Sequence, residues 1–156
     1  MQWTAGDFAG FTGGRPWFNV HHDYAQGVNV ADEATDPNSM LSYYRTLIHL
    51  RNQHAALRVG EAFLLSSDNP AVFAELRVSR QEAALVVVNL GQDPVIGYHL
   101  KLETGPLAGK YLAAPVLGQG EFVAPIVNAQ GGFEGYQPLP TLPPYSSFII
   151  QLQSAR

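Results

Sequence analysis

The spacing of apolar side chains predicts one helix, at about residues 36–57. Asp36 can accept hydrogen bonds from the free N–H groups of a first turn, and Pro37 fits the next position, where no N–H partner is needed. Apolar positions then recur every three or four residues and form a stripe along one side. These positions are Met40, Leu41, Tyr44, Leu47 and Ile48.

After Gly60 the pattern changes to short apolar or alternating runs bounded by Gly, Pro, Asn or Asp, which is typical of β-strands. Seven such runs cover residues 61–65, 72–78, 83–90, 95–102, 110–116, 122–127 and 147–152. About seven short strands at this spacing favour an antiparallel Greek-key β-sandwich. The predicted fold class is therefore mainly β: a sandwich preceded by a long loop and one α-helix.

Residues 1–35 have no sustained periodicity, and glycines lie between single aromatic residues. A loop of this length inside a compact domain requires an explanation. Its aromatic side chains indicate that it packs on something, which need not be in this chain. They are Trp3, Phe8, Phe11, Trp17, Phe18 and Tyr24.

Composition narrows the classes of function. Hydrophobic residues make up 46% of the 156 residues and charged residues 14%, which indicates a folded chain. The net charge of −4 without any basic run argues against nucleic-acid binding. The absence of cysteine excludes disulfides and thiolate metal sites. No signal peptide and no apolar run long enough to cross a bilayer are visible, so no membrane role is expected and a cytoplasmic location is slightly favoured.

Four motifs in the first 60 residues resemble glycoside hydrolase family 13, in the branch of oligo-1,6-glucosidases, α-glucosidases and trehalose synthases. Residues 1–3 (M-Q-W) are similar to the end of an R-T-P-M-Q-W signature, and residues 9–12 (A-G-F-T) with Pro16 and Trp17 are similar to an A-G-F-T…P-W loop. Residues 28–30 and 36–39 resemble an N-V…D-P-x-S stretch. Residues 43–51 resemble a Y-Y-R-x-L-I-x-L-R helix.

The resemblance implies a domain organisation. Residues 1–57 would be a remnant of a (β/α)8 barrel, made of the loop after the eighth strand and then the eighth helix at about 36–57. Residues 58–156 would be an α-amylase-type C-terminal β-sandwich domain. The first partner expected for the chain is therefore the missing N-terminal barrel.

No residue of the chain is expected to be catalytic. Retaining glycosidases need two carboxyl groups about 5–5.5 Å apart. None of the 13 acidic residues lies in a context that resembles the family's catalytic motifs. The parent is expected to be a retaining glycoside hydrolase or a transglycosylase acting on α-glucosides.

Phe11 and Trp17 are the candidate substrate-binding residues, because flat aromatic faces can stack on sugar rings. The resemblance implies that their loop borders the substrate cleft. The alternative is that both, with Trp3, only pack on the barrel. His21, His22 and Asp23 could suggest a metal site, but adjacent residues rarely converge on one ion, so neither a metal nor a cofactor is expected.

The expected function is that of a non-catalytic C-terminal piece that stabilises the barrel of an α-glucosidase-like enzyme. The alternative is a carbohydrate-binding module for α-glucans or oligosaccharides, with an oligosaccharide as its ligand. A homodimer through the exposed helix face is a further expectation, because an uncovered apolar stripe favours self-association.

Overall fold

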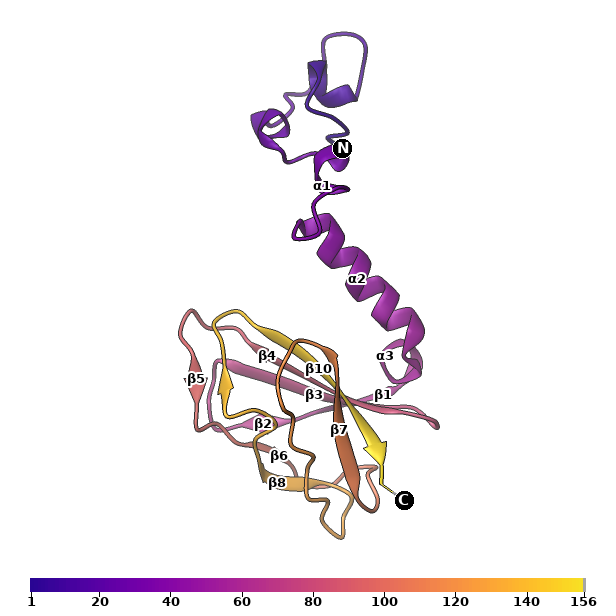
Figure 1. Ribbon diagram of the computed structural model, residues 1–156, viewed down its shortest axis with the longest axis vertical. Helices are drawn as coiled ribbons and strands as arrows, with labels where there is room; N and C mark the ends of the chain where they lie inside the picture. The colour runs from indigo at the N-terminus through magenta and orange to yellow at the C-terminus, as the bar shows by residue number, and fades with distance from the viewer. Residues whose placement is uncertain (156) are drawn as a thin grey trace. The chain divides into compact units, whose positions relative to one another are not determined.

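The computed structural model describes residues 1–155, and the chain divides into two compact units, Met1–Leu50 and Arg51–Arg156. Each unit has its own internal contacts and is described by itself (Figure 1). Helix α2 (Met40–Gln53) runs across the boundary between them.

The first unit is built of short helical turns. They are η1 (Asp7–Gly10), η2 (His22–Gln26), α1 (Val30–Glu33) and the beginning of α2. All of its residues are described, and among them Ala9 is the one apolar side chain that is fully buried. A unit with so few buried apolar groups gains little hydrophobic stabilisation of its own.

Helix α2 begins later than the sequence indicates. The side chain of Asp36 accepts from the N–H of Asn38 at 2.8 Å, which forms a turn before the helix. Ser39 is the residue that caps the first helical turn, since its Oγ accepts from the N–H of Ser42 at 3.1 Å. The helix ends at Gln53, and a separate short helix, α3 (Ala55–Val59), follows His54.

The apolar stripe of α2 is present and is only partly covered, since Leu41 and Leu47 are half-buried and its other three residues are exposed. Met40 is 65% exposed, Tyr44 58% and Ile48 55%. The prediction that a barrel or a second copy of the chain covers this stripe therefore stays a prediction.

The second unit consists of α3 and three antiparallel sheets (Figure 1). The large sheet has the order β1-β3-β4-β10-β7, a three-stranded sheet has the order β2-β6-β8, and β5 pairs with β9. The strands of the large sheet are β1 (Glu61–Leu64), β3 (Val72–Val78), β4 (Ala83–Asn89), β7 (Tyr111–Leu117) and β10 (Ser147–Ser154). The others are β2 (Ser66–Ser67), β5 (Val95–Ile96), β6 (Leu100–Leu102), β8 (Phe133–Tyr136) and β9 (Thr141–Leu142).

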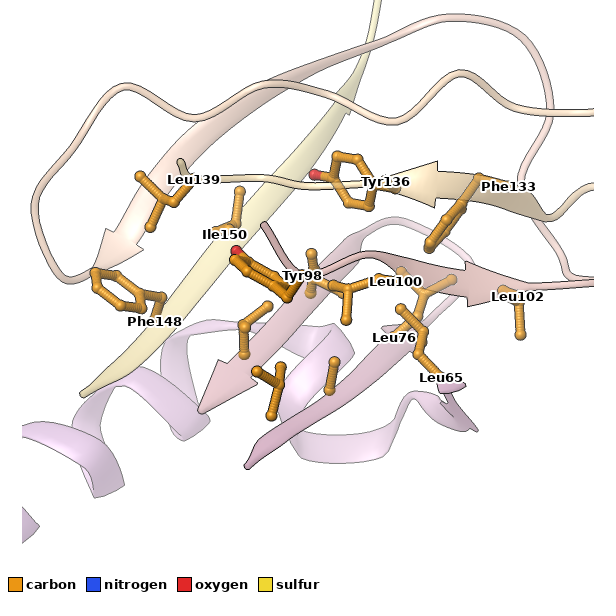
Figure 2. Packing of buried hydrophobic residues seen from close by; sticks show 14 of the residues in the cluster. Leu65, Leu76, Tyr98, Leu100, Leu102, Phe133, Tyr136, Leu139, Phe148 and Ile150 are labelled. Atoms are coloured by element: carbon orange, nitrogen blue, oxygen red, sulfur yellow. The ribbon is translucent and has the colours of Figure 1, made fainter. Parts of the chain in front are cut away.

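Strand β4 is the centre of the large sheet, because it pairs with β3 on one side and β10 on the other. Leu85 and Val87 are fully buried on the face toward the small sheets, and Ala84 is buried on the other face. In Figure 2 the rings of Tyr98, Phe133 and Tyr136 lie in the core on that first face. The unbroken apolar run in β4 therefore corresponds to a strand that is covered on both faces.

Asn89, at the end of β4, is a fully buried polar side chain. Its Nδ2 donates to the carbonyls of Asp93 at 2.8 Å, Leu142 at 3.2 Å and Pro143 at 2.9 Å. Its Oδ1 accepts from the N–H of Gly91 at 2.9 Å. One amide thus fixes two loops that are far apart in the sequence.

The predicted fold class, a mainly β Greek-key sandwich preceded by a loop and one helix, is wrong. We find one five-stranded sheet and two small sheets, and four of the ten strands described have only two or three residues. The strand predicted at residues 95–102 is interrupted because Gly97 adopts a left-handed conformation with φ 67°. The strand predicted at 122–127 does not form, and it contains Pro125, which cannot donate to a ladder.

Helix α3 covers part of the outer face of the large sheet, where Ala56, Ala84 and Ile149 form a second, smaller cluster. Glu82, just before β4, holds the start of this helix: its side chain accepts from the N–H of Ala56 at 3.1 Å and contacts the ring Nδ1 of His54. Burial raises the pKa of Glu82, but the hydrogen bonds from His54, Ala56 and Gln151 outweigh it, so the pKa lies below its usual value.

Asn89 is expected to contribute far more to stability than an exposed asparagine. Asn89→Ala removes the only side-chain donor described for the carbonyl of Leu142 and one of the two described for that of Pro143, which Ser146 Oγ also contacts, so the free energy of unfolding should fall by about 2–4 kcal/mol. Urea unfolding followed by circular dichroism measures this loss. Asn52→Ala is the control, since Asn52 is exposed, its side chain makes none of the hydrogen bonds described, and its loss should cost less than about 1 kcal/mol. Equal losses in the two variants would contradict the importance of burial.

Glu82 is expected to make stability depend on acid pH. Because its folded pKa lies below the ordinary 4.5, its contribution is complete above that value and is lost as the pH falls through the folded pKa. Glu82→Gln should lower the free energy of unfolding by about 1–3 kcal/mol at neutral pH and flatten its decline below about pH 5. Unfolding curves across this range test it, with the exposed Glu121→Gln as control. If the free energy of unfolding of Glu82→Gln fell with decreasing pH in parallel with that of the unmodified chain, Glu82 would be excluded as the source of the acid sensitivity.

Candidate functional site

A pocket with a volume of about 860 Å³ lies within the first unit. Such a volume is in the range of small-molecule sites, which are mostly apolar with a few polar groups. Its walls include the aromatic side chains of Phe11, Trp17, Phe18 and Tyr44. Polar side chains that line it include Gln2, His21, Asn29 and Glu33.

One wall of the pocket is fixed by backbone pairing between residues 2–3 and helix α1. The carbonyl of Gln2 accepts from the N–H of Val30, and that of Trp3 accepts from the N–H of Ala31, both at 3.0 Å. Asn29 caps the same helix, since its Oδ1 accepts from the N–H of Asp32 at 3.0 Å. Its buried position is therefore explained by satisfied hydrogen bonds.

Glu33 joins α1 to the beginning of α2 at the pocket. Its Oε2 accepts from the N–H of Leu41 at 3.0 Å, and its backbone carbonyl accepts from Ser39 Oγ at 2.7 Å. A carboxylate at the first turn of a helix also interacts favourably with the helix dipole. Its second oxygen, Oε1, makes none of the hydrogen bonds described.

The structure brings Phe11 and Trp17, the two predicted substrate-binding residues, to the same pocket. Phe11 is 55% exposed and Trp17 93% exposed, and the Trp17 ring meets Phe18 edge to face at a centroid distance of 6.0 Å. Trp3, the third aromatic residue considered, does not line this pocket. Whether Phe11 and Trp17 contact a sugar stays a prediction.

His21, His22 and Asp23 form a local cluster at the beginning of η2, which His21 precedes. His21 Nδ1 lies 2.9 Å from Asp23 Oδ1, and Gln2 Nε2 donates to the same oxygen at 2.9 Å. The hydrogen bonds from His21 and Gln2 lower the pKa of Asp23. Within residues 1–155, no three His, Asp or Glu side chains are grouped so that they could hold a metal ion. The sequence offers no periodicity that would have placed His21 at the pocket.

Among the residues that line this pocket, Glu33 is the single carboxylate. Retaining glycosidases use a pair, so this pocket alone cannot cleave a glycosidic bond by that mechanism. A smaller pocket of about 530 Å³ in the second unit includes Glu82, whose two oxygens are already engaged by His54, Ala56 and Gln151. In the described part of the chain, no helix is long and apolar enough to span a membrane.

The family described as "Alpha amylase, catalytic domain" matches residues 1–60. The chain is 38% identical over 96 residues to a probable oligo-1,6-glucosidase 2 of Bacillus subtilis, covering 62% of this chain and 17% of that protein. It is 37% identical over 93 residues to the trehalose-6-phosphate hydrolase of Escherichia coli, covering 60% of this chain and 17% of that protein.

Solved structures give a similar result over more of the chain. The trehalose-6-phosphate hydrolase of Bacillus licheniformis superposes with a TM-score of 0.69 at 25% identity, over 97% of this chain and 25% of that one. The isomaltulose synthase of Erwinia rhapontici NX5 has a TM-score of 0.64 at 31% identity, over 97% and 24%. The chain thus spans about a sixth to a quarter of the relatives that it matches.

These findings overturn the expected function. The interpretation as a non-catalytic C-terminal piece that stabilises a barrel is wrong, and so is its alternative, a carbohydrate-binding module, because residues 1–60 match a catalytic domain. The same match corrects the assignment of the chain to a C-terminal β-sandwich fold. The motifs at residues 1–3, 9–12 and 43–51 lie inside the matched range. The resemblance itself is confirmed: the first 60 residues match the catalytic domain of the α-amylase family, and the relatives that the chain resembles include oligo-1,6-glucosidases and trehalose-6-phosphate hydrolases.

Proposed function

We propose that this chain supplies part of the catalytic domain of an enzyme that acts on α-glucosides, and that the pocket of the first unit contributes to sugar binding. The observation that carries the proposal is that Phe11 and Trp17 line one pocket inside the range that matches a catalytic domain. The relatives named as oligo-1,6-glucosidase and trehalose-6-phosphate hydrolase suggest the substrate class.

The composition of the pocket suits a sugar. A pyranose ring offers apolar C–H faces and a rim of hydroxyl groups. The exposed rings of Phe11 and Trp17 provide flat apolar area for such faces. The Oε1 atom of Glu33 can accept a hydrogen bond from a sugar hydroxyl. The side chains of Gln2 and His21 line the same pocket.

The chemistry of bond cleavage requires groups from outside this pocket. A retaining reaction needs a nucleophile and an acid/base, and the pocket has one carboxylate, which is held by the N–H of Leu41. We therefore propose that the remaining part of the catalytic domain, the barrel expected as partner, provides the catalytic pair. The role of Phe11 and Trp17 is to bind and orient the substrate.

A chimera tests this function. The chain replaces the segment that it matches in the probable oligo-1,6-glucosidase 2 of Bacillus subtilis, and hydrolysis of a chromogenic α-glucoside is measured. We expect a turnover rate within about tenfold of the unmodified enzyme. A folded chimera without turnover would refute the proposed function.

In the active chimera, Trp17→Ala should lower kcat/KM by about tenfold, mainly through a higher KM, because a ring that binds substrate and transition state equally contributes uniform binding. Trp17→Phe keeps an aromatic face and should lose less than about threefold. Ile126→Ala is the control, since Ile126 is 91% exposed and belongs to the second unit. Unchanged kinetics in Trp17→Ala would remove Trp17 from the binding site.

A further inference from the structure

The segment Phe8–Gly10 has an unusual backbone. Phe8, Ala9 and Gly10 are consecutive and all left-handed, with φ values of 53°, 58° and 65°. This conformation brings the Cβ of an L-residue close to its own backbone, so it is rare for phenylalanine and alanine. Backbone strain of this kind persists only where surrounding contacts impose it, and it is concentrated at functional sites.

Four backbone hydrogen bonds impose the left-handed turn. Within the turn, Ala9 N–H donates to Gly6 at 3.0 Å and Phe11 N–H donates to Phe8 at 3.1 Å. The carbonyl of Ala9 accepts from the N–H groups of Trp3 at 2.8 Å and Thr4 at 3.1 Å. Relaxing the turn would break these bonds around Ala9, whose side chain is completely buried.

These bonds connect the turn to the rest of the pocket. The same Trp3 accepts from the N–H of Ala31 in helix α1, and Gln2 accepts from Val30. A continuous set of backbone hydrogen bonds therefore runs from α1 through residues 2–4 to the turn. Phe11 is the next residue after the turn, and its ring lines the pocket.

Gly10 satisfies two constraints at once. Its φ of 65° favours glycine, and a Cβ at this position would lie 2.7 Å from Oγ1 of Thr4. Ala9 is small enough to be enclosed, and Phe11 follows as the aromatic side chain of the pocket. The three consecutive residues therefore have three separate physical roles.

We propose that the left-handed turn Phe8–Gly10, closed against Trp3 and Thr4, is a positioning element that fixes the ring of Phe11 in the sugar pocket, with Gly10 as its essential residue. The inference deepens the proposed function and rests on it for the identity of the ligand. The position of the ring itself can be measured without any ligand. Gly10 and Ala9 act through Phe11 and are not themselves binding residues.

The ring position is tested first, by fluorine NMR of the full chain labelled with 4-fluorophenylalanine. The resonance of residue 11 is identified from the Phe11→Leu variant. Gly10→Ala should shift this resonance toward that of an unfolded peptide, because the new Cβ meets Thr4. Gly13→Ala is the matched control in the same loop, since a Cβ there has nothing within 4 Å and φ is not left-handed. An unchanged resonance in Gly10→Ala would overturn the inference.

A rescue variant separates the two constraints. In Gly10→Asn combined with Thr4→Ala, the obstructing Oγ1 is absent and asparagine tolerates the left-handed conformation. The resonance of residue 11 should return close to its original position. Gly27→Ala, with φ 94° and open space around it, controls for left-handed strain elsewhere in the unit. A shift of residue 11 in Gly27→Ala equal to that in Gly10→Ala would mean that the turn has no specific role.

Titration of the same chains with isomaltose then tests whether the position of the Phe11 ring affects sugar binding. Gly10→Ala and Phe11→Ala should each weaken binding about tenfold. The double variant should bind no more weakly than Phe11→Ala alone, because the turn acts through that ring. Additive losses would overturn the positioning role. If the unmodified chain does not bind isomaltose although its residue 11 resonance responds to Gly10→Ala, the positioning inference is supported and the sugar site of the proposed function is refuted.

Discussion

The antiparallel pairing of β4 with β3 and β10 is the constraint on which the second unit depends. Leu85 and Val87 are enclosed on the core face of β4, while Ala84 is enclosed beneath α3 on the other. At the end of the same strand, Asn89 fixes two loops by four hydrogen bonds. A strand buried on both faces leaves no freedom of register, since a shift by one residue would bring Asn89 out of reach of its partners.

The first unit is organised by different forces. Its order comes from backbone hydrogen bonds and helix caps, and Ala9 is the single fully enclosed apolar side chain among its residues. Its larger apolar side chains remain exposed around the pocket, including Trp17. Exposed apolar surface of this extent is typical of binding sites and interfaces. This surface lies within residues 1–60, the range that matches a catalytic domain. The relatives are four to six times longer than the part of them that the chain covers.

The error in the expected function has a clear physical origin. The sequence predicts a β-domain for residues 58–156 and a remnant of a barrel for residues 1–57, and none of its acidic residues lies in a context that resembles the family's catalytic motifs, so a non-catalytic role is expected. The short turns of residues 1–35 have no periodicity, yet they form the pocket. The smaller sheets were also difficult to predict. Strands of two residues, such as β5 and β9, are defined by their partners across space and not by their own sequence.

The sequence by itself determined the elements whose residues carry local information: the apolar stripe of α2, the strands β3, β4 and β10, and the motifs that resemble family 13. Tertiary structure alone decided that Asn89 is buried, and that Phe11 and Trp17 share a pocket. The physical reason is the range of the interactions. Periodicity and capping preferences act over a few residues, whereas the left-handed turn at Ala9 depends on Trp3 and Thr4, and the pocket depends on helix α1, about twenty residues away.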